Sequence, residues 1–98
     1  LDAVVADTET TGLDTNRARL IEFGAVRIDR GVLATEGFSL RVNPREPIPR
    51  SATDVHGIDD AAVANAPDFP AAWPQISTFM GDRLWIGHTI GFDLAVLT

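Results

Sequence analysis

The sequence contains no cysteine. Disulfide bonds, thiol catalysis and thiolate metal ligands are therefore excluded for these residues. Lysine is also absent, because all 8 basic residues are arginines. Without lysine, this chain can form neither a Walker phosphate-binding loop nor a Schiff base.

Positive charge is scarce. The 14 acidic residues outnumber the 8 basic ones, so the formal net charge is −6. We therefore expect no broad basic face that neutralises nucleic-acid phosphates. An acidic protein can still act on nucleic acid where carboxylates hold divalent cations, because the ions reverse the local charge.

Long apolar runs are missing as well. No stretch approaches the length of a membrane span, and no signal-peptide pattern opens the chain. With 45% hydrophobic residues among 98, the composition is that of one small globular domain. We expect a cytoplasmic protein with no membrane partner.

The first half of the chain predicts three strands. Residues 3–6 form a short apolar run that ends before Asp7, which indicates a buried strand. Alternating residues predict a second strand over 19–29, and a third is expected over 35–42. Their short connections favour antiparallel neighbours.

Helices are expected to follow. The prolines of residues 43–49 exclude regular structure there. Ser51 is a candidate N-cap for a helix over 52–55, which His56-Gly57 is expected to close. Asp59 or Asp60 is a candidate N-cap for a further helix over 61–65.

A longer helix is predicted over residues 71–80, with Pro74 in its first turn. A brief strand is expected over 84–86. A final helix is expected to begin at Gly91 or Phe92.

The main indication of chemistry is the pair Asp7 and Glu9. Side chains two residues apart on a strand point to one face, so these carboxylates converge at the exit of the first strand. Such like charges repel, and Mg²⁺ or Mn²⁺ bound by their oxygens would relieve the repulsion. Two ions about 3.5–4 Å apart would activate water and stabilise the leaving 3′-oxygen of a phosphodiester. The alternative is a solvated pair of acids that caps the following turn.

Four segments, in order, resemble motifs of the DnaQ-like exonucleases of the DEDD superfamily, which include the proofreading epsilon subunit of bacterial DNA polymerase III. They are residues 4–13 (VVADTETTGL), 20–26 (LIEFGAV), 42–58 with a proline loop and His-Gly-Ile, and 87–93 (GHTIGFD). The resemblance implies an α/β fold with a ribonuclease H-like mixed sheet and flanking helices. It also implies a 3′–5′ exonuclease that releases nucleoside monophosphates.

The resemblance assigns metal-binding and catalytic roles to three carboxylates. Asp7 would bridge two Mg²⁺ or Mn²⁺ ions, Glu9 would bind the ion that activates water, and Asp93 would act mainly through water ligands. The implied partners are 3′ ends of single-stranded DNA or RNA, with a DNA polymerase subunit as a further candidate.

The same resemblance implies a substrate site beside the carboxylates. The main chain around Thr10, Thr11 and Gly12 would hold the terminal nucleotide, and Leu13 would pack against its base. Phe92 is a further expected substrate contact. Packing of a base on an apolar side chain tolerates any sequence, as a non-specific exonuclease requires.

The two histidines have structural alternatives. His56 either approaches the bound nucleotide or bonds nearby carbonyls at the end of its helix. His88 is expected to shape the loop before Asp93 rather than to act in catalysis. Trp73 and Trp85 are expected to be core residues.

The sequence departs from the family pattern at two points. Thr89 replaces the usual Asn, which would loosen the loop that carries Asp93. The third family motif, with its general base and fourth carboxylate, does not occur within the 98 residues. We therefore expect the N-terminal portion of a single domain, truncated before that motif and missing its C-terminal strand and helix. Little or no activity and self-association through an uncovered apolar face are expected of it.

Two rival interpretations remain. A haloacid-dehalogenase-type phosphatase also begins with an apolar strand and an acidic pair, but it requires a second Asp where this chain has Glu9, and a lysine. A non-catalytic domain of exonuclease fold would bind nucleic acid or protein instead. An H-x-x-x-x-D stretch beyond Thr98 would favour the enzyme.

Overall fold

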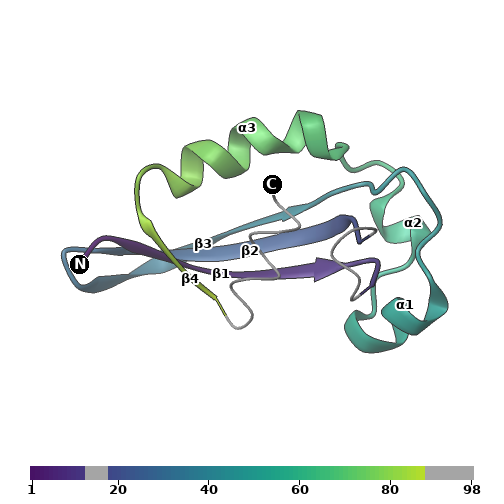
Figure 1. Cartoon of the computed structure of the whole chain (residues 1–98), viewed down its shortest axis with the longest axis horizontal. Coiled ribbons are helices and arrows are strands. Elements are labelled where there is room, and N and C mark those ends of the chain that lie inside the picture. Colours follow the sequence, from purple (N-terminus) through teal and green to yellow (C-terminus); the bar gives the residue numbers. More distant parts are fainter. Residues whose placement is uncertain (13–17, 88–98) are drawn as a thin grey trace.

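A single four-stranded sheet organises the computed structural model, which describes residues 1–12 and 18–87. The strand order is β3-β2-β1-β4. The elements are β1 (Ala3–Thr10), β2 (Leu20–Asp29), β3 (Val32–Arg41), α1 (Arg50–His56), α2 (Asp60–Val63), α3 (Phe69–Met80) and β4 (Leu84–Gly87). The order agrees with the expected meander followed by helices and a strand (Figure 1).

The first strand is longer than its apolar run predicts. β1 pairs antiparallel with β2 from Ala3 opposite Ile28 to Thr10 opposite Leu20. The strand therefore continues past the apolar run of residues 3–6, because pairing with β2 extends it. On its other side β1 pairs in parallel with β4, which makes the sheet mixed as expected.

A two-residue turn joins β2 to β3. Arg30 and Gly31 both have positive φ, 53° and 79°, as the tight hairpin turns that match strand twist require. This turn places Val32 directly opposite Asp29. The third strand therefore starts three residues before the predicted position 35.

Proline, and not serine, precedes α1. Pro49 occupies the N-cap position without a side-chain hydrogen bond, so the predicted Ser51 cap is wrong. The carbonyl of Pro49 instead accepts hydrogen bonds from the N–H groups of Ala52 and Thr53. Gly57 ends the helix with φ 76°, a left-handed conformation that glycine adopts readily.

Aspartates cap the other two helices. The Asp59 carboxylate accepts from the Ala62 N–H, while the Asp60 carboxylate accepts from the N–H of Ile48. Asp68 caps α3 through the Ala71 N–H. Its cap starts α3 two residues before the prediction, so that Pro74 lies in the second turn and not in the first.

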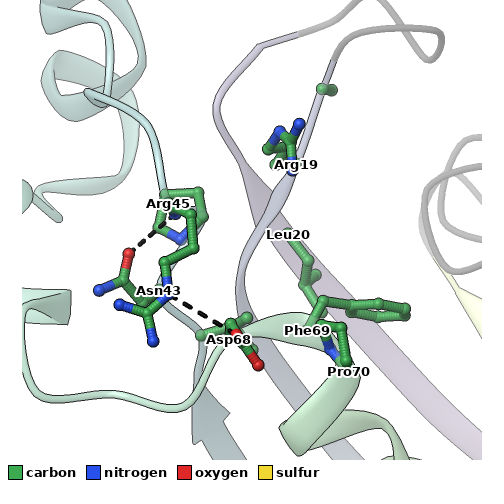
Figure 2. A pocket seen from close by; sticks show the side chains of 10 residues that line it. Arg19, Leu20, Asn43, Arg45, Asp68, Phe69 and Pro70 are labelled. Atoms are coloured by element: carbon green, nitrogen blue, oxygen red, sulfur yellow. Dashed lines mark hydrogen bonds and ion pairs between the residues drawn. The ribbon is translucent and has the colours of Figure 1, made fainter.

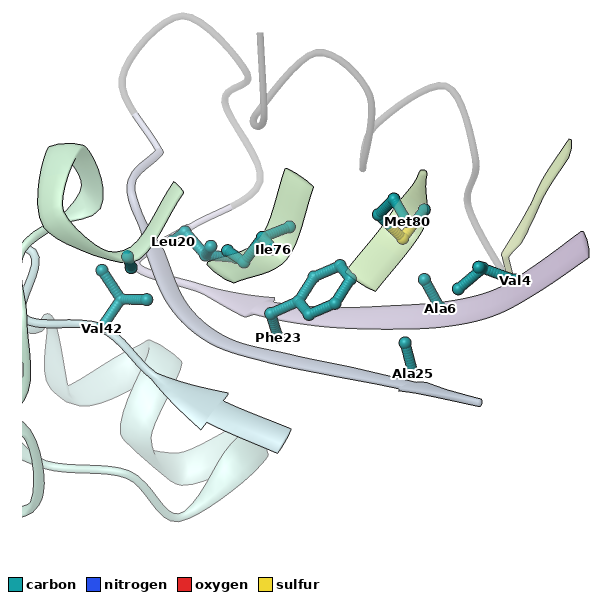
Figure 3. Packing of buried hydrophobic residues seen from close by; sticks show 9 residues of the cluster. Val4, Ala6, Leu20, Phe23, Ala25, Val42, Ile76 and Met80 are labelled. Atoms are coloured by element: carbon teal, nitrogen blue, oxygen red, sulfur yellow. The ribbon is translucent and has the colours of Figure 1, made fainter. Parts of the chain in front are cut away.

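Helix α3 covers one face of the sheet (Figure 1). Figure 3 shows its Ile76 and Met80 above Phe23 of β2 and the β1 residues Val4 and Ala6. The full buried cluster is Val4, Ala6, Leu20, Phe23, Ala25, Val42, Ala72, Ile76 and Met80.

The two tryptophans, Trp73 and Trp85, are partly buried and pack against the cluster under α3. Their predicted role as core residues is confirmed.

A second buried cluster fixes α1 and α2 at the end of the sheet. It consists of Ile21, Ile48, Ala52, Ile58 and Val63. Ile21 of β2 is fully buried there. The cluster places α1 beyond the C-terminal end of β1 (Figure 1), and the second half of that strand carries Asp7 and Glu9.

Among the described residues, no helix has the length and apolar character needed to cross a membrane. The predicted helix that begins at Gly91 or Phe92 lies outside the described residues.

Candidate active site at the end of the first strand

Asp7 and Glu9 lie on the sheet face that points away from α3. Val4 and Ala6, on the same strand, are buried under α3. Because successive side chains on a strand alternate between faces, Asp7 and Glu9 point to the opposite side. Asp7 is exposed and Glu9 is partly exposed.

This pair suits hard divalent cations. Carboxylate oxygens are the donors that Mg²⁺ and Mn²⁺ prefer. Within residues 1–12 and 18–87, no group of three or more His, Cys, Asp or Glu residues surrounds a potential metal position. The third expected ligand, Asp93, lies outside this range, as do Leu13, His88, Thr89 and Phe92.

The β2 residues that lie opposite the two carboxylates differ in size and charge. Gly24 lies opposite Asp7, and Glu22 lies opposite Glu9. A Cβ atom added at Gly24 would stand 4.0 Å from the Asp7 carbonyl oxygen. The glycine therefore leaves the space beside Asp7 without a side chain from β2.

Hydrogen bonds order the main chain directly after the carboxylates. The Thr10 hydroxyl donates to the Gly12 carbonyl at 2.6 Å. The Thr11 N–H donates to the Arg19 carbonyl, and the Arg19 N–H donates to Thr11 Oγ1, both at 3.0 Å. The proposed contacts of Thr10, Thr11 and Gly12 with a nucleotide remain predictions.

His56 connects α1 to the end of β1. The Ile58 N–H donates to its Nδ1 at 3.1 Å, and its Nε2 lies 3.1 Å from the Thr10 carbonyl oxygen. Because an N–H can only donate, Nδ1 acts as acceptor, and the neutral ring carries its proton on Nε2. Both ring nitrogens thus bind main chain, but the carbonyl is that of Thr10 on β1 and not one at the end of α1. Its contact with a nucleotide stays a prediction.

We expect His56→Ala to lower the free energy of unfolding by about 1–3 kcal/mol, because it leaves the Ile58 N–H and the Thr10 carbonyl without this partner. Urea denaturation followed by circular dichroism measures the change. Val55→Ala is the control, because the neighbouring Val55 is 84% exposed and such substitutions stay within about 0.5 kcal/mol. Equal stability of the two variants would refute this linking role.

A separate cavity lies at the start of α3 (Figure 2). Its volume is about 460 Å³, and its walls come from residues 18–20, 42–45 and 68–70. None of the predicted site residues lines it.

Both arginines of this cavity have acidic partners. Arg45 Nε lies 3.7 Å from Asp68 Oδ2, and Arg19 Nε lies 3.4 Å from Glu46 Oε2. No sequence pattern indicates the cavity, because three distant segments form it.

Known exonucleases are similar to this chain over almost its entire length. The profile of the exonuclease family RNase_T matches residues 4–98. The chain belongs to this exonuclease family. The predicted resemblance to DnaQ-like exonucleases is thereby confirmed.

Two curated relatives of the exonuclease family carry DNA polymerase III names. The DNA polymerase III subunit epsilon-like protein of Rhodobacter capsulatus is 41% identical over 99% of this chain and 14% of its own length. DNA polymerase III subunit epsilon of Aquifex aeolicus is 34% identical over 93% of this chain and 45% of its own length. The chain thus spans less than half the length of either relative.

Solved exonucleases share the fold. Exonuclease X in complex with 5′ overhanging duplex DNA superposes with a TM-score of 0.83 at 29% identity, over 98% of this chain and 54% of that chain. Exonuclease I of E. coli in complex with a dT13 oligonucleotide has a TM-score of 0.83 at 19% identity, over 98% and 22%. The expected ribonuclease H-like fold class is confirmed.

Proposed function

We propose that the protein is a metal-dependent 3′–5′ exonuclease that releases nucleoside monophosphates from nucleic-acid 3′ ends. The observation that supports this most is the position of Asp7 and Glu9. Both lie on the strand face opposite α3, in a chain of the exonuclease family.

In this proposal the carboxylates hold Mg²⁺ or Mn²⁺ together with Asp93. Two bound cations would supply an activated water and stabilise the leaving 3′-oxygen. Asp7 and Glu9 would supply carboxylate oxygens that hold the cations. The bond from His56 Nε2 to the Thr10 carbonyl, at 3.1 Å, would keep the end of β1 in place for a terminal nucleotide.

Single-stranded DNA is the substrate that the relatives favour, with RNA as the other candidate. Exonuclease I was solved with dT13, and the Aquifex relative is a polymerase III subunit. We propose DNA 3′ ends as substrate, a DNA polymerase subunit as a candidate partner and a cytoplasmic location.

We also propose that the 98 residues alone have little exonuclease activity, because they do not include the third motif that the family resemblance implies. Self-association also stays a proposal. It is supported by Val5, Leu84 and Ile86, which are 39%, 59% and 39% exposed. In the sheet register, Val5 lies beside Ile86 and Ala3 beside Leu84, so these side chains point away from α3.

A labelled oligonucleotide tests the proposed activity. With Mg²⁺ or Mn²⁺, we expect the full-length protein to shorten a 5′-labelled single strand stepwise from its 3′ end, and a chelator to stop the reaction. The 98 residues alone should give little product. Internal cuts without a 3′ ladder would contradict the proposal, and binding without any cleavage would favour the non-catalytic alternative.

A further inference from the structure

We propose that Glu22 is a positioning residue that keeps Arg41 away from Glu9. The inference rests on the proposed function, because it concerns the cation site formed by Asp7 and Glu9. Its basis is a row of three charged side chains across the sheet.

The row consists of cross-strand neighbours. Glu9 on β1 lies opposite Glu22 on β2, and Glu22 lies opposite Arg41 on β3. Residues opposite each other in adjacent strands point to the same face. All three side chains therefore share the face that bears Asp7.

Within this row, the guanidinium group binds the middle residue. Arg41 Nε lies 3.3 Å from Glu22 Oε2, and the two side chains are 49% and 31% exposed. An ion pair of such exposure adds little to stability. The pair lies directly beside Glu9, a candidate cation ligand.

Glu22 lies between a like charge on β1 and an opposite charge on β3. A carboxylate directly opposite another carboxylate destabilises the strand pair. Neutral residues at both Glu22 and Arg41 would avoid this repulsion. The bond to Arg41 offsets part of this repulsion, because opposite charges on adjacent strands stabilise their pairing.

Without Glu22, Arg41 could reach toward Glu9. Strands in a sheet are about 4.8 Å apart, so β3 and β1 are separated by roughly twice that spacing. Long arginine and glutamate side chains can bridge much of such a gap, and guanidinium groups bind carboxylates strongly. Arg41 would then compete with divalent cations for Glu9. Glu22 prevents this by holding Arg41 one strand away.

Mn²⁺ binding to the full-length protein tests the proposal. Free Mn²⁺ is measured by electron paramagnetic resonance at low ionic strength for the wild type, Glu22→Gln, Arg41→Gln and the double variant. We expect Glu22→Gln to raise the dissociation constant about three- to five-fold, the range that an exposed ion pair supports. Arg41→Gln and the double variant should stay within about two-fold of the wild type. The loss should shrink at high salt, because salt screens exposed charges.

The Arg41→Gln variant discriminates between mechanisms. If the two side chains acted only through their charges, Arg41→Gln would bind Mn²⁺ about three- to five-fold more tightly than the wild type, which would overturn the proposal. Unchanged binding by Glu22→Gln would also overturn it. If Glu22→Gln does not fold, Glu22→Thr replaces it, because β-branched residues suit strands.

A further variant separates this proposal from the proposed function. Asp7→Asn should lose Mn²⁺ binding if the carboxylates hold the cation. A wild type that binds no Mn²⁺, or an Asp7→Asn variant that binds equally well, would overturn both. Loss in Asp7→Asn with no change in Glu22→Gln would overturn the role of Glu22 alone.

Discussion

Asp7→Asn should lower the metal-dependent exonuclease activity of the full-length protein by roughly 10³-fold or more. A catalytic metal supplies several kcal/mol of transition-state stabilisation, and each 1.4 kcal/mol or so corresponds to a factor of ten in rate. Asparagine keeps the shape of Asp7 but removes the charge that holds the cation. The rate of release from a 5′-labelled single strand with Mn²⁺ measures the effect.

The fold of the Asp7→Asn variant should persist. Asp7 is exposed, and removal of one of two neighbouring like charges reduces their repulsion. Thermal unfolding without metal should therefore occur at the same temperature as in the wild type, or a higher one. Asp54→Asn on α1 is the matched control, because Asp54 is also an exposed carboxylate, and it should keep full activity. Retention of activity by Asp7→Asn would exclude Asp7 as a metal ligand.

Phe23→Ala should have the largest effect on stability. Phe23 is 0% exposed, and its ring meets that of Phe38 edge to face with centroids 6.1 Å apart. Removing a buried aromatic ring costs about 3–5 kcal/mol through lost burial and the cavity left behind. This is a large part of the roughly 5–15 kcal/mol that stabilises a typical domain.

The same substitution should affect the site. Phe23 lies opposite Thr8, the residue between the two carboxylates. Loss of its packing should therefore disturb the part of β1 that carries Asp7 and Glu9. Urea denaturation measures the loss of stability. Val32→Ala is the control, because Val32 is 69% exposed and its truncation should cost less than about 0.5 kcal/mol. A cost for Phe23→Ala below about 1 kcal/mol would show that the packing under α3 does not stabilise the sheet.

Local signals predicted several elements well. Gly57 ends α1 as expected, because only the residues around it are needed to form a left-handed helix end. The second strand was predicted to within one residue, from 19–29 to Leu20–Asp29. In that strand, successive side chains point to opposite faces of the sheet, whichever strands pair with it.

Other features required contacts between distant residues. The apolar run of β1 stops before Asp7, yet pairing with β2 carries the strand to Thr10. The bond from His56 to the Thr10 carbonyl spans 46 positions. No local pattern predicts such a bond, because the docking of α1 through the Ile21 cluster decides it.

By itself, the sequence determined the chemistry available to this protein. Within these 98 residues it excludes thiol and lysine chemistry, places Asp7 and Glu9 two residues apart and carries the motifs of the exonuclease family. The tertiary structure decided what surrounds the carboxylates. The row from Glu9 through Glu22 to Arg41 exists only because the strand register aligns three separate segments. Residue types and spacing are local properties, whereas register depends on the burial of whole strand faces under α3.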